Sequence, residues 1–384
     1  MVGIPSKLKS KLKKREEENS LRELPSSAVW IDFFSNDYLG LAQEPAIERE
    51  AEIMLKTYPK VISGATGSRL LSGNHVLYFD LENFICQHHN SEAALVFNSG
   101  YDANVGLFSS VPQRGDVVLY DELAHASIRD GIKMGNAQSY KFQHNDLEDL
   151  ENRIKKIKSK SADLDIYVVT ESVFSMDGDS PDLISLSALC VAHDCYLIVD
   201  EAHAAGIFGQ GRDLISDLGL SELVFARIIT FGKAIGHHGA AVLGSRALKN
   251  YLVNFARSLI YTTALPPHSL AMVLSAYVHM NSNGHEAIRI LQENIAHFKV
   301  EKKRLGLEDR FISSDSAIHC LILPGNEKVK QLALHLQSSG YGVKPILSPT
   351  VKAGSERLRI CLHSYNTKEE ISRVLQEIKS YLGQ

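Results

Sequence analysis

Apolar runs of four or five residues recur along the middle of the chain, separated by stretches whose apolar positions have helical spacing. Several of these runs are apolar throughout instead of alternating with polar residues, which is typical of strands buried on both faces of a sheet. The clearest runs are 93–97, 117–120, 166–170, 196–199 and 227–230. Because helical stretches lie between them, the pattern predicts right-handed crossovers and a mostly parallel α/β sheet within a large domain, residues 46–285.

The pattern changes after about residue 286 and predicts a smaller α+β domain over residues 286–384. Its expected elements are a helix at 287–305, a strand at 318–323, a helix at 327–339, a strand at 358–362 and a last helix from about 367. Residues 1–45 are predicted to form an N-terminal helix and an irregular arm with a short strand at 30–34. We expect this arm to pack with the smaller domain.

Composition and charge narrow the class of protein. Of the 384 residues, 44% are hydrophobic and 22% are charged, as in ordinary soluble domains. The net charge of −4 gives no electrostatic reason to expect nucleic acid, and no apolar run approaches the length that spans a membrane. The chain starts without the apolar core of a signal peptide, and its five cysteines contain no C-x-x-C pair. We therefore expect a cytoplasmic protein without disulfides.

Two of the predicted strands run directly into reactive groups. The run 197–199 leads into Asp200 and His203, and the run 228–230 leads through Gly232 into Lys233. A lysine can form a Schiff base with the aldehyde of pyridoxal phosphate (PLP), and an aspartate can keep the pyridine nitrogen protonated. Since ligands bind at the carboxyl ends of parallel strands, this pair predicts a PLP site.

Three further turns after predicted strands could complete such a site. Gly100 and Tyr101 open a helix whose free backbone N–H groups would suit a phosphate, and Thr230 could add a hydroxyl group. His125 could stack on the pyridine ring, and Ser175 could reach the phenolic oxygen of the cofactor or the substrate. Each segment also has a plainer interpretation, as an ordinary turn or a structural histidine.

Two competing motifs are rejected. Residues 200–203 read D-E-A-H, as in nucleic-acid helicases, but a helicase also needs a phosphate loop of the form G-x-x-x-x-G-K-[S/T]. Here Lys233 is followed by Ala234 and comes after the D-E-A-H. His237 and His238 suggest a metal, but no third ligand has suitable spacing, so no metal site is predicted.

Arg357 and Arg359 lie in a predicted strand of the smaller domain and face the same side of it. Either could be an ordinary surface charge. An arginine placed over the site would instead bind a substrate carboxylate through two parallel hydrogen bonds.

Taken together, these segments resemble the α-oxoamine synthases, a group of fold-type-I PLP enzymes. The resemblance covers nearly the whole chain and includes several further segments in the correct order: 35–40, 66–69, 173–179 and 261–267. It implies a large PLP-binding domain with a smaller α+β domain, and a homodimer whose active site is shared between the subunits.

The resemblance also implies individual roles. Lys233 would bond to the cofactor aldehyde, Asp200 to the pyridine nitrogen and His203 to the phenolic oxygen, while His125 would stack on the ring. The other implied cofactor-binding residues are Gly100, Tyr101, Ser175, Thr230 and, from the second subunit, Thr263. Asn36 and Arg359 are implied on the substrate side.

The implied reaction is a decarboxylative condensation of an amino acid with an acyl thioester. L-Alanine with pimeloyl-CoA, or with the same acyl group on a carrier protein, is the expected pair. Glycine with acetyl-CoA and L-serine with palmitoyl-CoA are alternatives inside the family, and a catalytically silent binding protein of this fold is an alternative outside it. Some family members carry an arginine where this chain has Leu347, so Lys344 is a candidate for binding a distal carboxylate.

Overall fold

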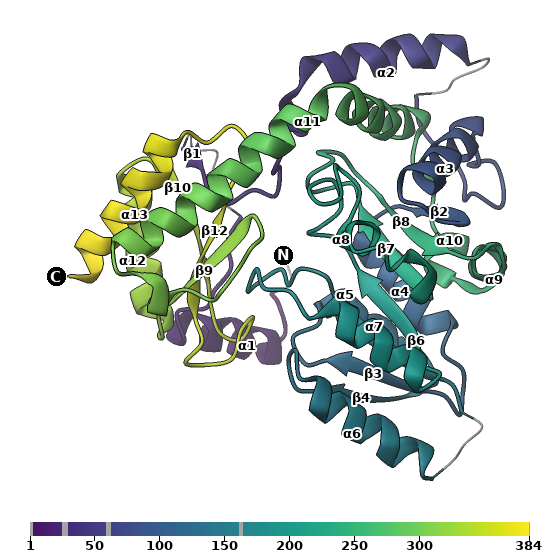
Figure 1. The fold of residues 1–384 in the computed structure, drawn as a ribbon, viewed down its shortest axis with the longest axis horizontal. Helices are drawn as coiled ribbons and strands as arrows, with labels where there is room; N and C mark the ends of the chain where they lie inside the picture. Colours follow the sequence, from purple (N-terminus) through teal and green to yellow (C-terminus); the bar gives the residue numbers. More distant parts are fainter. Residues whose placement is uncertain (1–2, 25–29, 59–62, 161–163, 384) are drawn as a thin grey trace. The chain divides into compact units, whose positions relative to one another are not determined.

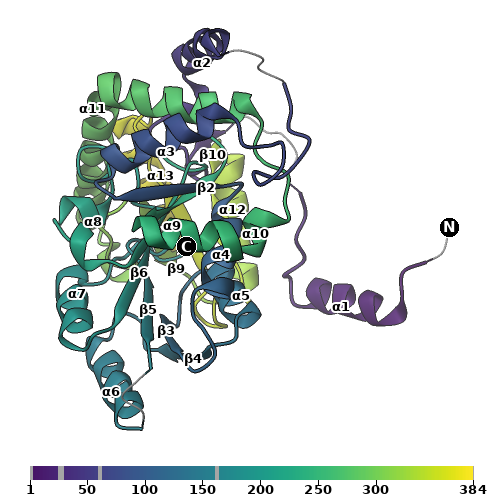
Figure 2. The same cartoon turned by 90° about the vertical axis from the view of Figure 1, so that its right-hand side faces the viewer.

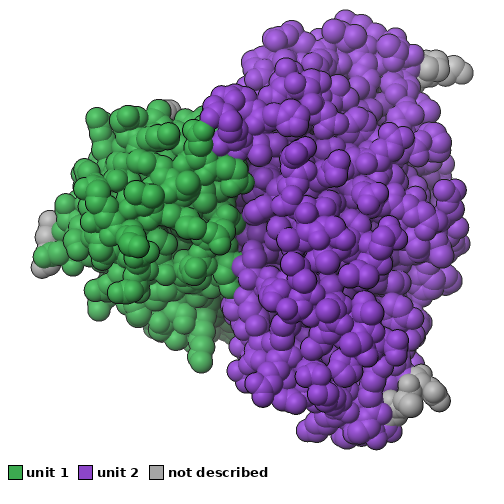
Figure 3. Space-filling view, in the orientation of Figure 1, with its two compact units in different colours: residues 1–35, 176–179, 290–384 green, residues 36–175, 180–289 purple. Residues whose placement is uncertain are grey.

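The computed structural model describes residues 3–24, 30–58, 63–160 and 164–383. The chain forms two compact units (Figure 3). The small unit comprises Met1–Ser35, Met176–Asp179 and Ile290–Gln384, and the large unit comprises Asn36–Ser175 and Ser180–Arg289. The domain boundaries predicted after residues 45 and 285 are a separate division of the chain, and they stay a prediction. Residues 25–29 of the predicted arm lie outside the described residues.

The large unit is built on a seven-stranded sheet with the order β2-β8-β7-β6-β5-β3-β4 (Figure 1). Its strands are β2 (Ala93–Phe97), β3 (Val117–Asp121), β4 (Gln138–Phe142), β5 (Ile166–Glu171), β6 (Tyr196–Asp200), β7 (Ala226–Thr230) and β8 (Ala240–Gly244). Strand β8 is antiparallel to both of its neighbours, and the other pairs are parallel. This arrangement confirms the predicted mostly parallel α/β sheet.

Each face of the sheet carries its own apolar core, which explains the uninterrupted apolar runs. Within β6, Ile198 packs into one core while Leu197 and Val199 pack into the other. One core is covered by α4 (Gly100–Ser110), α5 (Ala126–Met134), α9 (Arg246–Phe255) and α10 (Arg257–Ile260). The other is covered by α6 (Leu147–Lys158), α7 (Leu183–Ala192) and α8 (Leu214–Asp217), and Figure 2 shows these elements from a second side.

Two strands of the sheet were not predicted. Strand β4 lies at the edge, and four of its five residues are exposed, so it lacks the apolar pattern of a buried strand. Strand β8 begins with two alanines and ends in Gly244, a composition with little strand preference. Its place is set by pairing with β2 and β7 on either side. The remaining elements of the large unit are α2 (Pro45–Thr57), α3 (Val76–His88) and the short 3-10 helices Leu41–Gln43 and Ser221–Leu223.

The small unit combines a three-stranded antiparallel sheet with helices, as the α+β pattern predicted. Its elements are α1 (Ser6–Glu17), β1 (Ile31–Asp32), a 3-10 turn (Glu308–Arg310), β9 (Ile318–Ile322), α12 (Asn326–Ser338), β10 (Tyr341–Gly342), β11 (Lys344–Ile346), β12 (Arg357–Cys361) and α13 (Lys368–Leu382). Strand β1 of the arm pairs with β10, so the predicted packing of the arm with this part of the chain is confirmed.

The helix predicted at 287–305 is longer than expected. Helix α11 runs without interruption over Pro267–Arg304 and contains residues of both units. The sequence pattern missed its first half, which has buried positions on several sides, such as Leu270, Ala271 and Val273. No helix in the described part of the chain is both long and apolar enough to cross a membrane.

Candidate active site

A cavity of about 160 Å³ lies in the large unit at the carboxyl ends of the central strands. Its lining residues are Gly100, Tyr101, Asn104, His125, Ser127, Glu171, Ser175, Asp200, Ala202, His203, Ile228, Thr230 and Lys233. Eight of the eleven site residues predicted from the sequence therefore border a single cavity. Their individual roles remain predictions. The structure brings them together because parallel strands β5, β6 and β7 end at the same edge of the sheet.

The carboxylate of Asp200 is fixed at the end of β6. Its Oδ2 accepts a hydrogen bond from the side-chain amide of Asn104 at 2.8 Å, and its Oδ1 accepts from the backbone N–H of Ala202 at 2.9 Å. The Asn104 amide also donates to the hydroxyl of Ser127 at 3.0 Å. Asn104 is 2% exposed and was not predicted, because a single asparagine inside an apolar helix gives no local sign of its partner.

His203 is oriented by a buried tyrosine. Its Nδ1 lies 2.7 Å from the hydroxyl of Tyr38, and that hydroxyl donates to Oδ1 of Asn36 at 3.2 Å. A phenol has one proton, so when Tyr38 donates to Asn36 it accepts from His203 Nδ1. Asn36 itself does not line the cavity, but this chain of hydrogen bonds connects it to a residue that does.

His125 is held both by its side chain and by its backbone. Its Nδ1 lies 2.7 Å from the hydroxyl of Ser127 and accepts the backbone N–H of Ser127 at 3.2 Å, at the start of α5. Its own backbone N–H donates to the Glu171 carboxyl at 2.7 Å. Burial lowers the pKa of His125. The negative charge of Asp200 raises this pKa, and the positive charge of Lys233 lowers it. A neutral imidazole at this place is suited to stacking on a ring.

The opposite part of the cavity has the features of a phosphate site. Gly100 and Tyr101 are the first residues of α4, whose initial N–H groups have no partner inside the helix. A Cβ atom added to Gly100 would lie 3.7 Å from the side chain of Thr230, so the helix start and this threonine border the same space. The hydroxyl of Thr230 also accepts the backbone N–H of Gly232 at 3.3 Å, one residue before Lys233.

Three predicted residues do not line this cavity. Thr263 is exposed, and its carbonyl oxygen accepts the side-chain amide of Asn98 at 2.7 Å. Its predicted contribution from a second subunit remains a prediction. Asn36 accepts a hydrogen bond from Tyr38, which contacts His203, and Arg359 belongs to strand β12 of the small unit.

Both arginines of strand β12 belong to the small unit. Arg357 forms a buried ion pair with Asp177 and donates to the carbonyl oxygen of Met176 at 3.0 Å. The positive charge of Arg357 is therefore balanced by Asp177 inside the small unit. Arg359 is buried on the same strand, and its binding of a substrate carboxylate stays a prediction.

Of the histidine pair after Lys233, His237 is partly buried and His238 is exposed. Burial and the neighbouring His268 lower the pKa of His237 to about 4. Among the described residues, no group of three or more potential ligands is arranged for a metal ion.

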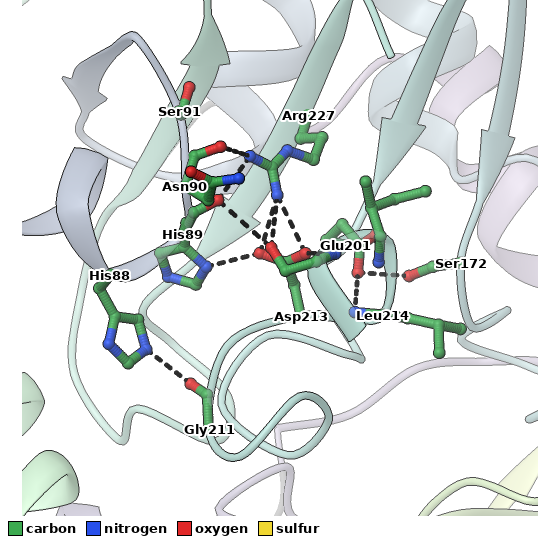
Figure 4. A network of polar contacts seen from close by, with 12 residues as sticks. His88, His89, Asn90, Ser91, Ser172, Glu201, Gly211, Asp213, Leu214 and Arg227 are labelled. Atoms are coloured by element: carbon green, nitrogen blue, oxygen red, sulfur yellow. Dashed lines mark hydrogen bonds and ion pairs between the residues drawn. The ribbon is translucent and has the colours of Figure 1, made fainter. Parts of the chain in front are cut away.

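A second polar cluster lies directly behind the site, where β6 continues into Glu201 (Figure 4). The guanidinium group of Arg227 donates to both carboxylate oxygens of Asp213, at 3.0 and 3.1 Å, and to the carbonyl oxygen of His89 at 2.7 Å. His89 Nδ1 lies 2.6 Å from Asp213. Burial alone would raise the pKa of Asp213, but His89 and Arg227 hold it well below its usual value. This cluster was not predicted from the sequence.

Replacing Arg227 with methionine is expected to destabilise the large unit by about 3–5 kcal/mol, because it leaves the buried Asp213 charge without its partner. Urea unfolding followed by circular dichroism measures this loss. Arg246→Met is the matched control, since the ion pair of Arg246 with Glu92 is long (3.9 Å) and both side chains are exposed. That change is expected to cost less than about 1 kcal/mol. Equal losses in the two variants would contradict the role of the buried cluster.

The residues around the cavity fit pyridoxal phosphate. They supply an amine in Lys233, a buried carboxylate in Asp200, a neutral imidazole in His125, and a helix start with a threonine for a phosphate. Each of these groups suits a different part of the cofactor: the aldehyde, the pyridine nitrogen, the face of the ring and the phosphate.

Comparisons with known proteins agree with this geometry. The model of the family described as aminotransferase class I and II matches residues 28–378. The 8-amino-7-oxononanoate synthase of Emericella nidulans is 40% identical, with 98% of this chain and 95% of the relative covered. A serine palmitoyltransferase from S. paucimobilis, solved with a bound PLP–myriocin compound, superimposes with a TM-score of 0.88 at 26% identity, covering 98% of this chain and 96% of that one. An 8-amino-7-oxononanoate synthase from Francisella tularensis gives 0.77 at 29% identity, covering 92% and 98%.

Proposed function

Because the chain belongs to the class I and II aminotransferases and, among them, to the α-oxoamine synthases, we propose that it is a PLP-dependent acyltransferase that makes 8-amino-7-oxononanoate. The proposed substrates are L-alanine and pimeloyl-CoA, or the pimeloyl group on a carrier protein, and the other products are the free thiol and carbon dioxide. The reaction belongs to biotin biosynthesis. The observation that carries the proposal is the 40% identity to a named 8-amino-7-oxononanoate synthase over nearly the whole chain.

Four residues of the cavity have proposed tasks at the ring and aldehyde of the cofactor. When bound, pyridoxal phosphate supplies an electron-withdrawing ring that stabilises negative charge at the α-carbon of an amino acid. Lys233 would hold the cofactor through its aldehyde, and its free amine would be the base that removes the α-proton. Asp200 holds a proton on the pyridine nitrogen, and His203 bonds the phenolic oxygen. His125 supports the face of the ring.

The remaining cofactor contacts are proposed for Gly100, Tyr101 and Thr230 at the phosphate and for Ser175 at the phenolic side. Asn36 and Arg359 are proposed to orient the carboxylate of L-alanine. Arg359 would bind it through two parallel hydrogen bonds from its guanidinium group.

We also propose a homodimer in which Thr263 completes the phosphate site of the partner. The large unit exposes several large apolar side chains near this segment and at the start of α3, a distribution that supports an interface. The exposed fractions are 83% for Leu71, 65% for Phe79 and 72% for Tyr261. A cytoplasmic location is proposed with it.

A second candidate is serine palmitoyltransferase activity, because the chain superimposes on that enzyme with a TM-score of 0.88. The lower sequence identity, 26% against 40%, favours the first candidate.

The experiment that tests the proposal measures thiol release from pimeloyl-CoA with L-alanine. Glycine with acetyl-CoA and L-serine with palmitoyl-CoA are run beside it, and mass spectrometry identifies the amino ketone. Release with the first pair alone supports the proposal. Release only with another pair would retain the cofactor chemistry and contradict the proposed substrates. No thiol release with any of the three pairs, or with the carrier-protein form of the acyl donor, would contradict the hypothesis that the protein is an enzyme.

A further inference from the structure

We propose that Glu171 is a positioning residue of the cofactor site, whose carboxyl group holds the backbone of the two turns that carry His125 and Ser175. No role was predicted for this residue from the sequence. The inference rests on the pyridoxal phosphate binding proposed above and adds to it the element that fixes the ring-facing side chains.

The position of Glu171 puts one carboxyl group between two turns. It is the last residue of β5, it is 3% exposed, and it lines the cavity. Its Oε1 accepts the backbone N–H of His125 at 2.7 Å, and the backbone N–H of Ser175 also bonds to the same carboxyl group. The turn after β3 and the turn after β5 are therefore tied to one side chain.

This contact limits how His125 can move. The Nδ1 atom of its ring is already held by Ser127, and the bond to Glu171 fixes its backbone as well. With both ends held, the ring has little freedom to turn away from the cavity. Without the carboxyl group, buried N–H donors would lose their acceptor, which costs more than losing a hydrogen bond at the surface.

The electrostatic setting of Glu171 is consistent with a positioning task. Asp200 stands opposite it in the parallel register of β5 and β6. Burial and the charge of Asp200 raise the pKa of Glu171 to about 8, with Lys233 acting in the opposite direction. The raised pKa favours the uncharged form of Glu171, which lessens its electrostatic repulsion with Asp200.

Glu201 provides a matched control. It lies at the same end of the neighbouring strand β6, burial raises its pKa to about 8, and it also accepts two backbone N–H groups. Those donors are Leu214 and Ile215, both at 3.0 Å, and they belong to α8. Glu201 does not line the cavity. Glu171 thus holds two turns of the cavity, whereas Glu201 holds the start of α8 and the hydroxyl of Ser172.

The test compares Glu171→Asp, Glu171→Gln and Glu201→Asp. Aspartate keeps the carboxyl group but is one methylene too short to reach the same donors, whereas glutamine keeps the length and a carbonyl acceptor. Apo-protein is titrated with pyridoxal phosphate to obtain the dissociation constant, and circular dichroism in the visible absorption band reports how rigidly the bound ring is held. Unfolding midpoints of the apo-proteins separate stability from binding.

We expect Glu171→Asp to raise the dissociation constant by about 10-fold and to weaken the visible dichroism per bound cofactor. Glu171→Gln is expected to stay within about 3-fold of the parent protein, since its carbonyl oxygen can still accept. Glu201→Asp is expected to lower the unfolding midpoint while its dissociation constant and dichroism change little.

Three results would overturn the inference: unchanged cofactor binding and dichroism in Glu171→Asp, an equal loss in Glu201→Asp, or a loss in Glu171→Gln as large as that in Glu171→Asp. Should Glu171→Asp fail to fold, the comparison passes to Glu171→Met and Glu201→Met, which keep the side-chain volume. Equal dissociation constants for that pair would also overturn it. Failure of the parent protein to bind pyridoxal phosphate is a separate result that contradicts the proposed function.

Discussion

Lys233→Ala is expected to lower turnover of L-alanine and pimeloyl-CoA by at least about 10³-fold, because it removes both the amine that bonds the cofactor and the proposed base. Lys233 is half-buried in the turn between β7 and β8 and borders the cavity. The change removes a polar side chain from the wall of the cavity and leaves both strands intact. We therefore expect the unfolding midpoint to stay close to that of the parent protein.

The measurement is the initial rate of thiol release, together with the visible absorbance of the protein after dialysis. Loss of the cofactor band on dialysis is expected, since only noncovalent contacts would remain. Lys141→Ala is the control, because Lys141 is largely exposed and forms only a surface ion pair with Glu122. Retained turnover in Lys233→Ala would remove this lysine from its proposed role.

Asp200→Asn is expected to give the second largest effect, a loss of turnover on the order of 10²-fold or more with weaker pyridoxal phosphate binding. A neutral amide cannot stabilise a protonated pyridine nitrogen as a carboxylate does. The surrounding structure can accept the change without unfolding. The Oδ1 atom of Asn104 has no hydrogen-bond partner among the described residues, so a turned Asn104 amide could accept from the new asparagine.

The control for this variant is Asp121→Asn. Asp121 is a buried aspartate at the end of strand β3, which β5 separates from β6, and it accepts from Leu123 and pairs with His144 outside the cavity. Its replacement is expected to affect stability and to leave the dissociation constant of pyridoxal phosphate nearly unchanged. Turnover of Asp200→Asn close to that of the parent protein would disprove the charge role of Asp200.

The sequence alone was sufficient to predict most strands of the sheet in the large unit. Strands β2, β3, β5, β6 and β7 were predicted because residues buried on both faces of a sheet must be apolar at every position, and this leaves a continuous run. The reactive groups could be located for a similar reason. Asp200 and Lys233 follow such runs directly, and parallel strands place their carboxyl ends at one edge.

Other parts of the fold depend on neighbours that are distant in the sequence. Strand β8 is defined by hydrogen bonds to β2 and β7 on both sides, so its own residues carry a weak signal. The pattern of the strand left Arg357 and Arg359 equivalent, and only the family resemblance selected Arg359. The ion pair of Arg357 with Asp177, nearly half the chain away, could not be read from the strand itself.

The sequence by itself therefore determined the fold class, the expected cofactor and eight of the residues that line the cavity. Only the tertiary structure identified the residues that hold site residues in place. Asn104 is hydrogen-bonded to Asp200, Tyr38 to His203, and Glu171 to the backbone of His125. The physical reason is that burial and strand direction leave periodic patterns in local sequence. A hydrogen bond between distant segments depends on the register and packing that bring its two atoms together, and it leaves no such pattern.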